Sequence, residues 1–114
     1  MRYREFNLRA NTSDAAATEI MYEIAAARVD KIDLIRINIS YDNEGDFSTE
    51  FKRTLSAIFK LLKSMKQKGS IQFFATEENF LKSTTEAVFL LNKYPDLISA
   101  QQEKNEAAFI YVKI

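Results

Sequence analysis

The 114-residue sequence contains no histidine and no cysteine. Neutral imidazole and thiolate are the usual general bases, nucleophiles and soft-metal ligands of proteins. Their absence excludes disulfides and every active site that depends on either side chain, so any catalysis would have to use carboxylates, hydroxyls, amines or backbone dipoles. From the sequence we assign no catalytic residue, no bound metal and no cofactor.

Glycine and proline are also scarce, with two residues and one residue respectively, and long apolar runs are missing. The longest run, residues 87–91, is far shorter than the roughly 18–20 residues of a membrane span. The N-terminal residues lack the apolar region of a signal peptide. Sixteen basic residues balance sixteen acidic ones, so net charge favours no class of partner. These features predict a single cytoplasmic domain over residues 1–114 that does not bind membranes.

Apolar periodicity predicts four strands and three helices in the order β-α-β-α-β-α-β. Strand patterns occupy residues 4–10, 32–41, 71–76 and 107–114, and helix patterns occupy residues 15–29, 48–67 and 84–94. This order predicts an α/β fold, specifically a two-layer α+β sandwich with a four-stranded mixed sheet. Because Arg36, Asn38 and Ser40 alternate with isoleucines in the second strand, we expect one face of the sheet to be open or partly open.

The helix predicted over residues 48–67 is rich in lysine and arginine. At about 100° per residue, its cations Lys52, Arg53, Lys60 and Lys63 fall in one arc opposite the apolar stripe. Such an arc can neutralise the phosphates of DNA or RNA, and Arg9 and Arg36 could add contacts from the sheet. A solvated, lysine-rich outer face is the alternative interpretation.

Aromatic residues are expected on the open face of the sheet. If Ile71 and Phe73 point toward the helices, then Phe74 joins Phe109 and Tyr111 on the opposite side. Together with Arg36 these rings could stack on single-stranded bases. They could equally form the interface of a homodimer or pack under another part of the same chain, because monomers rarely expose large apolar patches.

Three acids, Asp42, Glu44 and Asp46, follow the second predicted strand. Their oxygen ligands suggest a cation site, although the later ligands of a calcium loop are missing. This cluster supports a third hypothesis, metal-assisted cleavage of phosphodiesters.

The whole chain resembles the small MutS-related (Smr) domain family, in particular its short stand-alone members. The resemblance depends on the order and spacing of several short segments: Phe6-Asn7-Leu8, Leu34-Ile35-Arg36-Ile37, residues 73–80, residues 93–97 and residues 109–114. It implies a compact α/β sandwich, similar in outline to the C-terminal domain of translation initiation factor three. It also implies contact with DNA or RNA, and family members are associated with endonuclease activity.

The diagnostic motifs of the family are missing from this chain. Its Leu-Asp-Leu-His-Gly motif corresponds to Phe6-Asn7-Leu8-Arg9-Ala10, and its His-Gly-x-Gly motif to Ile39-Ser40-Tyr41-Asp42. The motif glycines would let a phosphate approach the backbone, whereas Asp42 would repel it. The sequence therefore predicts a degenerate, non-catalytic Smr-like domain that binds nucleic acid or a nucleic-acid-associated partner. The alternative is a protein-interaction or homodimerisation module that uses the open sheet face.

Overall fold

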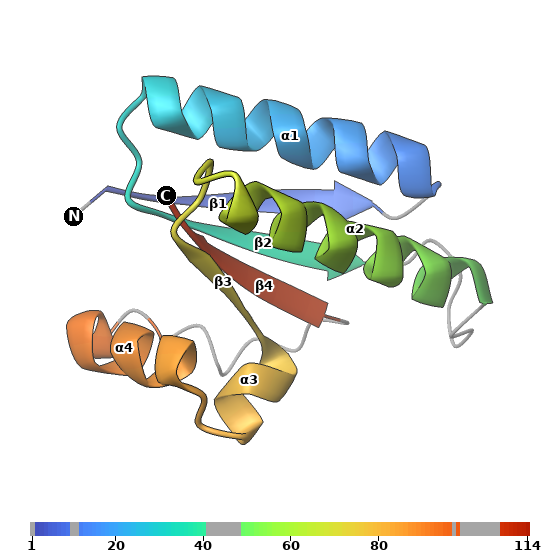
Figure 1. Ribbon diagram of the computed structural model, residues 1–114. Coiled ribbons are helices and arrows are strands. Elements are labelled where there is room, and N and C mark those ends of the chain that lie inside the picture. The colour runs from blue at the N-terminus through green and yellow to red at the C-terminus, as the bar shows by residue number, and fades with distance from the viewer. Residues whose placement is uncertain (1, 10–11, 41–48, 97, 99–107) are drawn as a thin grey trace.

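The computed structural model describes residues 2–9, 12–40, 49–96, 98 and 108–114 (Figure 1). The elements in these residues follow the order β1 (Tyr3–Arg9), α1 (Ser13–Val29), β2 (Leu34–Ser40), α2 (Thr49–Gln67), β3 (Phe73–Thr76), α3 (Glu77–Leu81), α4 (Thr85–Lys93) and β4 (Ala108–Lys113). The predicted α/β fold with a four-stranded mixed sheet is confirmed. The short helix α3 is an additional element that the sequence pattern did not predict.

The strands lie in the order β1-β2-β4-β3. β1 pairs with β2 in parallel, whereas β4 is antiparallel to both of its neighbours, β2 and β3. Consequently β1, β2 and β3 run in one direction, and β4 is inserted between β2 and β3 in the opposite direction. The central strand β2 is buried from Leu34 to Ile39 on both of its faces.

Helices α1 and α2 pack side by side on one face of the sheet (Figure 1). The β2 residues Ile35, Ile37 and Ile39 point toward these helices, as the alternation predicted, and meet Ile20 and Ile24 of α1. α2 contributes Ile58 and Leu62 to the same core. The inner stripe of α1 consists of Ala16, Ile20, Ile24 and Ala27, whereas Met21 is 52% exposed.

The opposite face of the sheet is covered over β3 and β4 by α3 and α4 (Figure 1). Leu90 and Tyr94 pack there against Leu34, Ala75 and Tyr111 in a second apolar cluster. This face is therefore partly rather than fully open, because β3 and β4 are covered whereas Glu5 and Asn7 of β1 remain exposed. The polar alternation of β2 was misleading because its buried polar side chains have partners within the protein, as described below.

Three of the helices end in the same backbone motif. After α1, α2 and α3, the chain enters the left-handed region at Lys31 (φ 57°), Gly69 (φ 78°) and Ser83 (φ 52°). In each case the amide N–H of the following residue reaches back five positions, as in Ser70 N–H to the Met65 carbonyl (2.9 Å). This is the Schellman arrangement, which usually places glycine at the left-handed position. Gly69 is the one glycine among these three positions, and it follows directly after the last turn of α2.

Candidate nucleic-acid interface

Helix α2 exposes its predicted cations along one side. Lys52, Arg53, Lys60 and Lys63 are all exposed, whereas the opposite side of the helix buries Ile58 and Leu62. We call these four cations the basic face. A rise of about 1.5 Å per residue separates Lys52 from Lys63 by about 16 Å along the helix axis. The basic face is therefore an extended row of charge rather than a single cluster.

The four cations of the basic face make no ion pair within the part of the chain that the structure describes. The ion pairs found there use other cations: Arg4 with Asp30, Lys66 with Glu86, and Lys82 with Glu78. Binding an anion would thus break no existing salt bridge of the basic face. Cations without ion-pair partners are available to neutralise phosphates.

Acidic residues of the helices are concentrated on other elements. α1 carries Asp14, Glu19 and Glu23, and α3 carries Glu77 and Glu78. The chain is neutral as a whole, but its cations and acids are unevenly divided among these helices. Local potential rather than net charge governs the attraction of a phosphate chain at short range.

The structure does not place Arg36 with the basic face. Arg36 is completely buried and lies on the sheet face opposite α2. Its Nε donates to Asn38 Oδ1 (2.7 Å), its Nη1 donates to the Tyr111 hydroxyl (2.7 Å), and its guanidinium lies 4.4 Å from the centre of the Phe109 ring. A side chain in this position cannot contact a phosphate at the surface. The prediction for Arg36 is corrected accordingly, and the side chain of Arg9 lies outside the described residues.

The three predicted interface aromatics do not share an open surface. Phe74 faces α1 and α2, where it packs against the first core, so the predicted orientations of Phe73 and Phe74 are reversed. Tyr111 is 1% exposed, and Phe109 and Tyr111 both contact the ring of Phe80 from α3. These rings are covered by the same chain, which is the third alternative that the sequence left open. These three aromatic residues are therefore not exposed together on this face to form the centre of the predicted homodimer interface.

A polar network accompanies the buried arginine. Asn38 Nδ2 donates to Asn7 Oδ1 (3.1 Å), and the Tyr3 hydroxyl donates to Glu5 Oε1 (3.0 Å). Burial, together with the hydrogen bond to Glu5, raises the pKa of the Tyr3 phenol above its ordinary value of 10.0. Tyr3 therefore stays a neutral donor, and the Asn38–Asn7 hydrogen bond links the side chains of β1 and β2 on this face.

The predicted acidic cluster Asp42, Glu44 and Asp46 lies outside the described residues. Elsewhere in the described chain, no group of three acidic side chains is placed to hold a metal ion. Among the same residues, no helix has both the length and the apolar content needed to cross a membrane.

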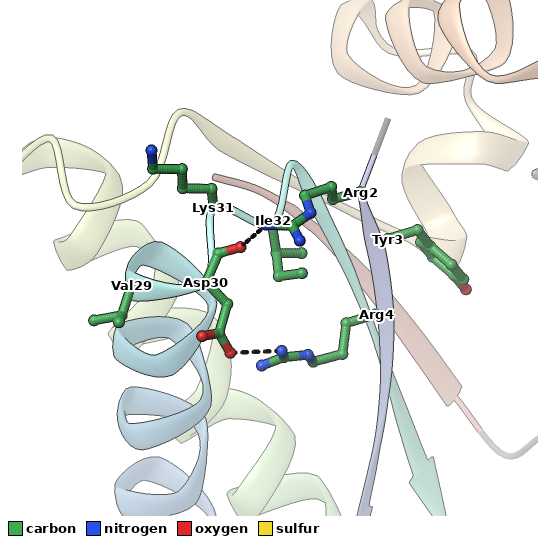
Figure 2. Close-up of a pocket in the computed structure, with 7 residues that line it drawn as sticks. All are labelled: Arg2, Tyr3, Arg4, Val29, Asp30, Lys31 and Ile32. Carbon is green, nitrogen blue, oxygen red and sulfur yellow. Dashed lines mark hydrogen bonds and ion pairs between the residues drawn. The ribbon is translucent and has the colours of Figure 1, made fainter.

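A separate hollow of about 720 Å³ lies where the end of α1 meets β1 (Figure 2). Its arginines are already engaged: Arg4 Nη2 contacts Asp30 Oδ2 (2.7 Å), and Arg2 Nη1 donates to the Asp30 carbonyl. Tyr3 and Lys31 point away from this ion pair in Figure 2. The negative end of the α1 dipole also disfavours an anion here. The contacts in this hollow join the end of α1 to the edge strand β1. The hollow is therefore a poorer candidate for binding an anion than the basic face of α2.

Two further residues beside the basic face were not among the predicted site residues. Lys66 and Phe59 line a hollow between α2 and β3 together with Lys63 and Phe74. Helical spacing places Phe59 and Lys66 next to Lys63, but only the packing of α2 against β3 shows that Phe74 joins them. No protein-family model, no curated protein and no solved structure matches this chain.

Proposed function

We propose that this chain is a non-catalytic, Smr-like domain that binds nucleic acid through the phosphate contacts of the basic face. The observation that carries the proposal is the row of four exposed cations without ion-pair partners in the described chain. The resemblance of the sequence to the Smr family supports the same class of partner. The proposal includes a cytoplasmic setting, because a chain without cysteine needs no oxidising compartment.

The binding in this proposal is electrostatic and independent of base sequence. Lysine and arginine side chains that neutralise phosphates release condensed counterions, so affinity falls as salt rises. The residues that nuclease motifs of the family would supply are absent, and no histidine is available as a general base. We therefore expect binding without cleavage.

The proposal is tested by replacing the basic face without changing the rest of the surface. In the test variant, Lys52, Arg53, Lys60 and Lys63 all become glutamine. We expect about a tenfold or greater loss of affinity for DNA and RNA at low salt, measured by fluorescence anisotropy.

The matched control removes the same number of charges elsewhere. Its positions are all exposed and lie on other elements or at their ends: Arg2→Gln, Arg28→Gln, Lys31→Gln and Lys93→Gln. This control should bind as the parent protein does, within about twofold, if location matters more than net charge. Equal losses in both variants would show only a general charge effect, and no binding by the parent at low salt would reject the proposal.

A further inference from the structure

The hollow between α2 and β3 combines aromatic surface with the end of the basic face. It has a volume of about 370 Å³, within the range of roughly 300–1,000 Å³ that is typical of small-molecule sites. α2 lines it with Phe59, Lys63 and Lys66, and β3 lines it with Phe74 and Thr76. Both rings are half-buried, so each presents part of its surface to the hollow.

The charges around this hollow are not equivalent. The Lys66 Nζ lies 3.8 Å from Glu86 Oε1, and Lys82 Nζ lies 2.7 Å from Glu78 Oε1. Glu86 and Glu78, which also line the hollow, are thus each held by a lysine. Lys63 is the lining cation that has no such pair in the described residues. The hollow therefore offers apolar rings beside one cation that is free to meet an anion.

We propose that this hollow receives an unstacked base of single-stranded nucleic acid, with Lys63 on the adjoining phosphate. This inference depends on the proposed function and names the class of nucleic acid that the interface prefers. An unpaired base presents a flat apolar surface next to an anionic phosphodiester, and this combination matches the rings of Phe59 and Phe74 beside Lys63. A base inside a duplex is stacked on its neighbours and cannot enter the hollow without being extruded.

The position of the hollow continues the basic face. Lys52, Arg53 and Lys60 precede Lys63 along the same exposed side of α2, so a strand that follows these cations reaches the hollow at the end of the row. β3 is an edge strand of the sheet, and α3 begins directly after it, so the hollow is open to solvent at the sheet edge. A flexible single strand can follow this path, whereas a straight duplex contacts only the exposed row.

The test separates bases from phosphates. The probes are a thymidine oligonucleotide of about 12 residues, within the site sizes known for single-strand binders, and an abasic strand with the same number of phosphates. The parent should bind the thymidine strand about tenfold more tightly than the abasic strand. In the Phe59→Leu variant this preference should fall to about twofold or less, with binding of the abasic strand unchanged.

Two control variants keep the result interpretable. Phe74→Leu repeats the test from the other side of the hollow, and Phe89→Leu changes an exposed ring on α4 that does not line it. Thermal melts establish that each variant is folded. Equal affinity of the parent for the thymidine and abasic strands would overturn the base site while leaving phosphate binding intact. No binding of either strand at low salt would reject both the base site and the proposed function.

Discussion

Arg36 has the largest side chain that is completely buried in the described part of the chain. Its hydrogen bonds to Asn38 and Tyr111 and its position over the Phe109 ring provide partners for a group that is costly to bury alone. These contacts join β2 to β4 on the face where α3 and α4 pack. We infer that this arginine is structural rather than part of a surface site.

Replacing Arg36 with alanine should lower the free energy of unfolding by about 3 kcal/mol. The change removes packing and leaves Asn38 Oδ1 and the Tyr111 hydroxyl without their donor. Urea denaturation measures the effect. Arg53→Ala, at an exposed position, is the matched control and should cost no more than about 0.5 kcal/mol. If the two variants were equally stable, the structural role of Arg36 would be refuted.

Asp33 gives a pH-dependent prediction at the same scale. Its Oδ2 accepts a hydrogen bond from the Arg2 backbone N–H (2.8 Å), and this bond lowers the pKa of the carboxyl below its ordinary value of 3.8. Because the pKa of Asp33 is lower in the folded state than in the unfolded state, its carboxylate stabilises the folded protein at pH values above the unfolded-state pKa. This contribution is lost as pH falls through the folded-state pKa.

In the Asp33→Asn variant, the amide oxygen can still accept from Arg2 but no longer titrates. The stability of parent and variant should therefore depend differently on pH between roughly pH 5 and pH 2, the range in which carboxyl groups become protonated. The parent should show the steeper decline, as followed by thermal melts across that range. Parallel curves for the two proteins would contradict the assignment.

At the scale of single elements, two of the three left-handed helix ends carry a residue other than glycine. Of the three left-handed positions, only Gly69 carries the residue that adopts this conformation without cost, whereas Lys31 and Ser83 carry a Cβ there. The same hydrogen-bond pattern forms in all three places. Two of these turns are therefore held in a less favourable backbone conformation by the packing of the elements on either side.

Lys31→Gly and Ser83→Gly should each raise the free energy of unfolding by about 0.5–1 kcal/mol. Gly69→Ala should lower it by about 1 kcal/mol, although the added Cβ would meet no atom within 4 Å. The loss would therefore come from the backbone conformation and not from a clash. Chemical denaturation of the three variants measures these changes, and an opposite sign at either non-glycine position would disprove the argument.

Local sequence patterns predicted where most helices and strands lie, but they did not predict that α3 and α4 cover one face of the sheet. The helix predicted over 84–94 is found as α4, capped by the Thr84 side chain, because capping and periodicity are local properties. α3 was missed because it is only five residues long, and its capping box is formed by Thr76 and Asn79 rather than by a longer apolar repeat. Polar residues in β2 suggested an open face because the local pattern does not show their hydrogen-bond partners, Tyr111 and Asn7, which lie on other strands.

The candidate site shows the same division. Exposure of Lys52, Arg53, Lys60 and Lys63 was predictable because a helix fixes which residues share a side. The burial of Arg36 was not, because it depends on Tyr111 and Phe109, which lie more than seventy residues later in the chain. The hollow beside Lys63 was not predictable either, since Phe59 and Phe74 meet only through the packing of α2 on the sheet.

Over the whole molecule, a neutral chain carries one exposed row of cations on α2 and acidic residues on α1 and α3. Under the proposed function, the row of cations would attract a polyanion locally, without the long-range attraction of a strongly basic protein. The same row would also orient the nucleic acid under this proposal, because the cations of the basic face follow the axis of α2. Association should accordingly be weak at physiological salt and strengthen steeply as salt is removed.

The most direct test of the phosphate-binding claim is the affinity of the parent protein for a single strand across a salt series. If the four cations of the basic face each neutralise one phosphate, the logarithm of the association constant should fall linearly with the logarithm of the salt concentration, with a slope of about −3. A slope near zero, or no binding at the lowest salt concentration, would contradict the account.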